Sequence, residues 1–182
     1  MARRTDRRPR PPLDQDKLSE LALSYVGRFA TTRAKLASYL ARKLRERGWE
    51  AERPADIDTI VERLVDLGYV DDAAYALSKS RALTGSGYGA RRVRQSLRAA
   101  GIGEEDGMEA AAAADSEAVE SALRFARRRR IGPYGNGGGD RSDRERVLAA
   151  MIRAGHSFAL AKAILSIEPG SNIDVEFLKE KG

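Results

Sequence analysis

The sequence predicts an all-α protein of three tandem three-helix repeats, which form an elongated array, straight or curved. Three observations lead to this prediction. Strong helix formers (Leu, Ala, Arg and Glu) dominate the 182 residues, whereas aromatic residues make up only 6%. Apolar residues recur at helical spacing, and no segment shows the alternation typical of a strand. A sequence motif also recurs with a period of 53 and then 54 residues.

Each copy of the motif places two apolar residues four apart on one helix face and follows them with a glycine. The copies are Leu40-x3-Leu44-x3-Gly48-Trp49, Val93-x3-Leu97-x3-Gly101-Ile102 and Val147-x3-Met151-x3-Gly155-His156. We expect each glycine to end its helix in a left-handed conformation. The lone histidine, His156, takes the place of Trp49 and Ile102, so a packing role is expected rather than a catalytic one.

Further helices are expected around each motif. One precedes each copy, at about 15–30, 72–84 and 115–130. An amphipathic helix spans 56–68 and ends at Gly68, and another spans 157–167 between the capping Ser157 and Pro169. The segment after Ile102 is a weaker helix because it contains Gly107.

These elements define the expected organisation of the chain. It consists of a disordered basic arm (1–14), repeat 1 (15–71), repeat 2 (72–114), repeat 3 (115–168) with a mobile Gly-rich loop (132–143), and a C-terminal tail (169–182).

Composition excludes several classes of function. Without cysteine and with one histidine, a thiolate site, a His-rich metal site and most acid–base schemes are unavailable, so we expect no enzyme, metal or cofactor. No apolar stretch approaches the roughly 20 residues of a membrane span, and the charged start is no secretory signal. A cytoplasmic monomer is expected. The acids of Gly68-Tyr69-Val70-Asp71-Asp72 are interpreted as helix caps rather than metal ligands.

The charge is net basic, at +6, and uneven along the chain. Six basic and no acidic residues lie between Lys79 and Ile102, seven acids and no base lie between Glu104 and Glu120, and Arg127–Arg130 follow. The acidic and basic blocks pair with each other, or the acids mimic phosphate for the protein's own basic face; the sequence leaves both readings open.

The segment 84–102 carries the main candidate site. Three glycines precede an Arg-rich helix, in which Val93, Leu97 and Ala100 form one face and three arginines lie opposite. Free amides at the helix start suit a phosphate or a carboxylate, and Tyr88 suits stacking; the alternative is a solvated face behind a flexible turn. The candidate partner- or DNA-binding residues are Arg81, Tyr88, Arg91, Arg92, Arg94, Arg98, Arg127 and Arg128.

The motifs Gly68-Tyr69-Val70-Asp71-Asp72, Tyr75-Ala76 and Tyr88-Gly89-Ala90-Arg91-Arg92-Val93-Arg94-Gln95-x-Leu97-x3-Gly101-Ile102 resemble the bacterial RecX regulatory family, over roughly residues 18–168. The resemblance implies tandem three-helix repeats and a non-enzymatic, cytoplasmic modulator of the RecA recombinase. Such a modulator lies in the groove of the RecA–DNA filament, limits its growth and damps its activities. The main rival is a DNA-binding module, sequence-nonspecific or helix-turn-helix-like, that contacts single- or double-stranded DNA.

Overall fold

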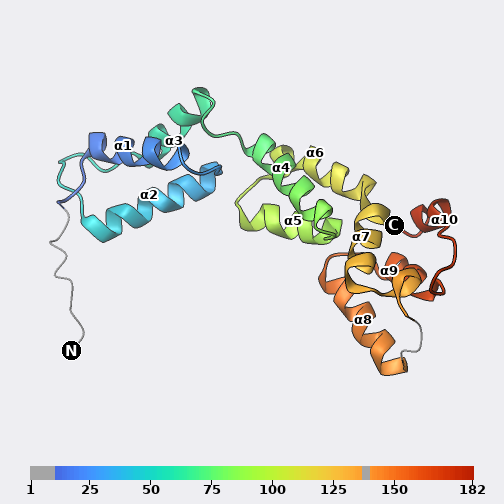
Figure 1. Ribbon diagram of the computed structural model, residues 1–182. Coiled ribbons are helices and arrows are strands. Elements are labelled where there is room, and N and C mark those ends of the chain that lie inside the picture. The colour runs from blue at the N-terminus through green and yellow to red at the C-terminus, as the bar shows by residue number, and fades with distance from the viewer. Residues whose placement is uncertain (1–10, 137–139) are drawn as a thin grey trace, which may run out of the picture. The chain divides into compact units, whose positions relative to one another are not determined.

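The computed structural model describes residues 11–136 and 140–182 (Figure 1). Within these ranges the chain forms ten α-helices and one 3-10 helix, and its strand pairing is limited to a single bridge between Leu13 and Trp49. The prediction of an all-α fold is therefore confirmed. The chain divides into two compact units, Met1–Asp72 and Ala73–Gly182. The expected elongated array stays a prediction.

The first unit contains α1 (Gln15–Val26), α2 (Arg33–Arg47) and α3 (Ile57–Asp66). Asp14, Thr32 and Asp56 cap the three helices, because each side chain accepts a hydrogen bond from a backbone amide of the first turn. The helices enclose one apolar core, whose buried side chains are Leu13, Leu18, Ala22, Leu36, Leu40, Ile60, Val61, Leu64 and Val70.

The expected boundary of the basic arm is wrong at its C-terminal end. Residues 1–10 lie outside the described residues. Leu13, however, is fully buried, and its amide and carbonyl bond to Gly48 and Glu50 at 3.0 Å each. Leu13 belongs to the first core because a distant segment supplies its partners, which local composition does not reveal.

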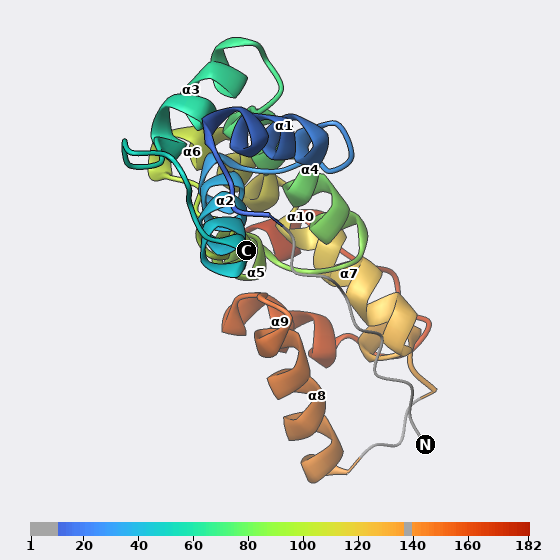
Figure 2. The same ribbon diagram turned by 90° about the vertical axis from the view of Figure 1, so that its left-hand side faces the viewer.

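The second unit begins with three helices, α4 (Asp72–Gly85), α5 (Ala90–Ala99) and α6 (Glu104–Ser116); Asp72 itself counts with the first unit. The elements that follow are α7 (Ala118–Arg129), the 3-10 helix η1 (Gly132–Tyr134), α8 (Arg141–Arg153), α9 (Phe158–Ser166) and α10 (Val175–Lys179). One core lies among α4, α5 and α6, and another among α7, α8, α9 and α10. Figure 2 shows α8 and α9 as consecutive helices joined by a short turn. Gly155 lies in this turn.

The glycines of the sequence repeat behave as expected. Gly48, Gly101 and Gly155 have φ angles of +82°, +74° and +99°, which glycine adopts without steric cost. The weakness expected at Gly107 is absent, because α6 runs through it. A Cβ there would lie 3.6 Å from Ile102 and 3.8 Å from Leu97, which is ordinary van der Waals contact, so this buried position has room for an alanine.

Two segments expected to be irregular are more ordered than predicted. The loop expected at 132–143 is shorter, because η1 occupies Gly132–Tyr134 and α8 begins at Arg141, capped by Asp140; residues 137–139 lie outside the described residues. The tail expected at 169–182 includes α10, and Leu178 is fully buried against α7 and α9. A short apolar segment gains this order from tertiary packing, which helical periodicity over five residues cannot reveal.

The contact between the start of α5 and the end of α8 is made by backbone atoms. The Gly89 amide donates to the Ala154 carbonyl at 2.9 Å, and the Arg91 amide donates to the Gly155 carbonyl at 3.2 Å. A Cβ on Gly89 would lie 2.4 Å from the Gly155 oxygen, and one on Gly155 would lie 2.5 Å from the Arg92 nitrogen. Only glycine at both positions permits this approach.

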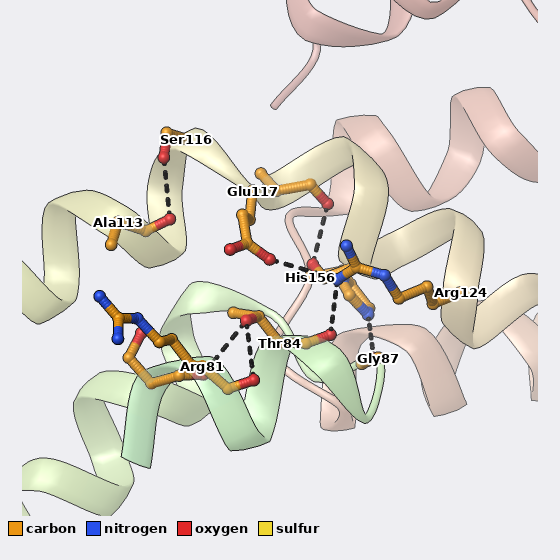
Figure 3. Close-up of polar contacts among 11 residues, drawn as sticks. Arg81, Thr84, Gly87, Ala113, Ser116, Glu117, Arg124 and His156 are labelled. Atoms are coloured by element: carbon orange, nitrogen blue, oxygen red, sulfur yellow. Dashed lines mark hydrogen bonds and ion pairs between the residues drawn. The ribbon is translucent and has the colours of Figure 1, made fainter. Parts of the chain in front are cut away.

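Side chains extend the same junction (Figure 3). Arg124 on α7 donates to the Thr84 carbonyl at 3.1 Å and pairs with Glu117 at 3.2 Å. The buried His156 ring bonds through Nε2 to the Gly87 carbonyl at 3.1 Å and lies edge-on to Phe125. Burial lowers the pKa of His156, although its hydrogen bond to Gly87 acts in the opposite direction. The packing role expected for His156 agrees with this position.

Replacing Leu64 or Leu97 with Ala is expected to lower the free energy of unfolding by about 2–5 kcal/mol, because each substitution leaves a cavity in a packed core. The two side chains are 6% and 4% exposed. Urea unfolding followed by far-UV circular dichroism measures the loss. An unchanged transition would contradict the core assignment.

Gly89→Ala and Gly155→Ala are each expected to cost about 1–3 kcal/mol, because the added methyl group meets backbone atoms that cannot move aside. Gly85→Ala is the matched control, since its Cβ meets nothing within 4 Å. Thermal unfolding of the three variants checks this. Equal melting temperatures for Gly85→Ala and Gly89→Ala would refute the role of the backbone contact.

Lowering the pH from about 7.5 to about 5.5 is expected to destabilise the fold through His156. The unfolded chain binds this proton near the ordinary pKa of 6.5, whereas the folded chain, with a lowered pKa, does not. Stability is therefore lost as the pH falls through 6.5. The melting temperature of His156→Gln should depend less on pH over this range, and equal dependence in both proteins would disprove the assignment.

Candidate functional site

Helix α5 presents its arginines much as expected, with one exception. Val93 and Leu97 are buried, and Arg91 and Arg98 on the other side are exposed. Arg94, which was expected to project freely, is half-buried and forms an ion pair with Asp115 of α6. The free arginines of this face are therefore fewer than the helical wheel predicts.

The expectation of free amides at the start of α5 is wrong. The amides of Gly89 and Arg91 already donate to carbonyls at the end of α8, and those of Arg92 and Val93 donate to the Gly89 carbonyl. The glycines before α5 thus permit close backbone contact. They do not form a phosphate-binding loop, because the amides of Gly89, Arg91, Arg92 and Val93 are already bonded within the protein.

The acidic block 104–120 pairs, in part, with neighbouring arginines. Asp115 pairs with Arg94, and Glu117 pairs with Arg124. These contacts favour internal pairing over phosphate mimicry for the two acids concerned. They leave the arginines at the end of α7 without an acidic partner from this block.

A groove with an arginine rim lies on the second unit, where α5, α7 and α8 meet. It consists of two adjoining depressions of about 300 and 370 Å³ that share Phe125, Arg129, Ala150 and Arg153. We call this feature the arginine groove. Its rim residues are Arg92, Arg128, Arg129, Arg146 and Arg153, and its other lining residues are Tyr88, Phe125, Ile131, Val147, Ala150 and Ala154.

Most of the rim carries uncompensated charge. Among the described residues, no carboxylate lies within ion-pair distance of Arg92, Arg128, Arg129 or Arg153. Arg92 donates to the Gln95 amide oxygen at 2.9 Å, and the Arg129 guanidinium lies 5.5 Å from the centre of the Phe125 ring. Arg146 alone of the five pairs with an acid, Asp143, at 2.7 Å. The groove therefore suits an anionic ligand.

The structure brings only some of the predicted residues into this groove. Tyr88, Arg92 and Arg128 line it. Arg127 points its guanidinium at the Tyr134 ring, 5.0 Å from the ring centre. The predicted residues outside the lining are Arg81, Arg91, Arg94, Arg98 and Arg127.

Sequence reasoning missed three rim residues, Arg129, Arg146 and Arg153. Arg129 lies within the recognised block Arg127–Arg130, but helix geometry decides which members of that block reach the groove. Arg153 lies two residues before Gly155, where the other copies of the motif carry Glu46 and Ala99. A comparison of the three copies therefore identifies Arg153 as a basic residue that the other two copies lack.

The metal reading of Asp71 and Asp72 finds no support. Asp72 accepts a hydrogen bond from the Arg33 amide at 2.9 Å, at the start of α2. In the described parts of the chain, no three His, Cys, Asp or Glu side chains gather as metal ligands would. Nor does any helix there have the length and apolarity required to cross a bilayer.

Comparison with known proteins places these features in a family. The family model for the second three-helix domain of RecX matches residues 71–110. The regulatory protein RecX of Myxococcus xanthus is 34% identical over 174 residues, covering 91% of this chain and 92% of the relative. That of Deinococcus radiodurans is 34% identical over 98 residues, which cover 54% of this chain and 45% of the relative.

Two solved RecX structures share the fold. The crystal structure of RecX from Lactobacillus salivarius has a TM-score of 0.65 at 21% identity and covers 82% of this chain and 92% of its own. A second regulatory protein RecX has a TM-score of 0.59 at 26% identity, covering 82% and 70%. The Myxococcus and Deinococcus relatives carry the name regulatory protein, which agrees with the non-enzymatic regulator expected from the sequence. Together with the match along nearly the whole Myxococcus protein, they show that this chain belongs to the RecX family of regulatory proteins.

Proposed function

We propose that this chain binds the RecA recombinase or its nucleoprotein filament and inhibits recombinase activity in DNA repair and the SOS response. Family membership carries the proposal. The division of the chain into three repeats, with Leu13 counted in the first and α10 in the third, belongs to the same proposal, as do monomeric action and a cytoplasmic location. No cofactor is required, because the protein acts by binding.

The charge of the second unit supports a partner that is rich in anions. Arg91 and Arg98 are exposed on α5, and four rim arginines of the groove lack acidic partners among the described residues. Exposed arginines increase the rate of association with an oppositely charged surface and fix its orientation. Both filament-bound DNA and acidic subunit surfaces provide such charge.

Sequence-nonspecific DNA binding is the second candidate function, and the same unpaired arginines favour it. A helix-turn-helix reader is less well supported. Such a reader contacts base edges with the N-terminal residues of its recognition helix. Here the N-terminus of α5 is hydrogen-bonded to the end of α8, at Ala154 and Gly155.

RecA-dependent ATP hydrolysis on single-stranded DNA tests the proposed function. The protein, titrated well below the RecA concentration, is expected to suppress hydrolysis, because blocking a growing filament affects many subunits. A reaction without RecA is the control. Unchanged hydrolysis, together with salt-sensitive binding to bare DNA, would support the DNA-binding module instead.

Replacing Arg91 and Arg98 with Ala is expected to weaken this inhibition and to leave helicity intact, because both side chains face solvent. Arg94 is left in place, since it pairs with Asp115. The matched control, Arg91→Lys with Arg98→Lys, keeps the charge and is expected to retain more of the inhibition. Full inhibition by the Ala variant would show that these two arginines do not contribute to the interface.

A further inference from the structure

The floor of the arginine groove contains an aliphatic side chain that the sequence repeat normally buries. Val147 occupies the motif position of Leu40 and Val93, which are both 0% exposed. In the third copy Val147 is only partly buried and lines the 370 Å³ depression beside Ile131 and Ala150. The groove thus contains an apolar surface that the fold leaves partly uncovered.

The rim above this surface selects for negative charge. Arg129, Arg146 and Arg153 line the depression that holds Val147, and of these only Arg146 pairs with an acid, Asp143. Within 11–136 and 140–182, no acidic side chain lines either depression. A ligand that fits must therefore combine carboxylates or phosphates at the rim with an apolar group at the floor. Burial of apolar area and charge complementarity then both stabilise the complex with the same ligand.

The chemistry of the floor favours a protein ligand over a nucleic acid. Single-stranded nucleic acids are held by bases stacked on exposed aromatic rings. The Phe125 ring is only 3% exposed, and it already contacts Arg129 and His156. Tyr88 is partly buried against the core. The remaining open floor is aliphatic, which suits a side chain such as leucine.

We propose that the arginine groove binds an acidic segment of a protein partner that inserts an aliphatic side chain against Val147. The carboxylates of the segment pair with Arg128 and Arg153, and the aliphatic side chain covers the floor. The inference rests on the proposed function in one respect, since it takes the partner to be a protein. An anchor side chain in a pocket with a charged rim is the usual source of affinity at such interfaces.

A double-mutant cycle tests this proposal with the full-length chain and without RecA. The probes are a fluorescein-labelled acidic peptide with one central Leu, the same peptide with Ser in its place, and a labelled oligothymidylate. The Leu peptide is expected to bind about tenfold more tightly than the Ser peptide, which is the gain from covering one aliphatic side chain. Val147→Ser is expected to remove most of this difference.

The rim has its own variants. Arg128→Ala combined with Arg153→Ala is expected to weaken both peptides about tenfold or more, whereas Arg144→Ala, an exposed position on α8 outside the groove, is expected to change neither. Circular dichroism verifies that each variant is folded, and Val147→Ala replaces Val147→Ser if the latter unfolds.

Three results would overturn the proposal: no binding of the Leu peptide, equal affinity for both peptides, or a Leu preference that Val147→Ser does not change. Oligothymidylate binding that is weakened by both the floor and the rim variants would assign the groove to single-stranded DNA. Because RecA is absent from these measurements, they can fail while the ATP hydrolysis experiment succeeds, and the two proposals are judged separately.

Discussion

The backbone contact between Gly89 and Gly155 determines where the charged side chains of the second unit gather. The start of α5 carries partial positive charge from its amides and the end of α8 carries partial negative charge from its carbonyls, so their apposition is favourable. With no Cβ on either glycine, the two helix ends approach within hydrogen-bond distance. Arg92 on α5 and Arg153 on α8 therefore line the same depression, although they are far apart in the sequence.

This way of assembling the groove explains how the fold tolerates a rim of like charges. The stabilising contacts of the junction are backbone hydrogen bonds, the His156–Gly87 bond and apolar packing around Phe125. None of them requires the guanidinium groups to be neutralised. The rim arginines are exposed, so water and salt screen their mutual repulsion. The charge of the groove is thus free to act on a ligand instead of being used within the fold.

Local signals predicted the parts of the structure that local interactions determine. Ser157 caps α9 as expected, and Gly48, Gly101 and Gly155 take positive φ angles, because caps depend on a few neighbouring residues. Features that depend on distant partners were missed or misread. Leu13 and Leu178 are buried by segments remote in sequence, and the amides near Gly89 are bonded to carbonyls 65 and 64 residues later. For the same reason, three of the predicted site residues reach the groove and Arg153 was not foreseen.

In a tandem repeat, the exposure of a residue in one copy can be compared with that of the equivalent residues in the other copies. The three copies of the motif carry an apolar residue at the same position, and two of them bury it completely, as Leu40 and Val93. In the third copy the surrounding positions carry Arg146 and Arg153, and Val147 between them is only partly covered. Val147 therefore leaves apolar area open beside the groove arginines, and this is the combination of apolar contact and charge that an acidic segment with an aliphatic side chain would use.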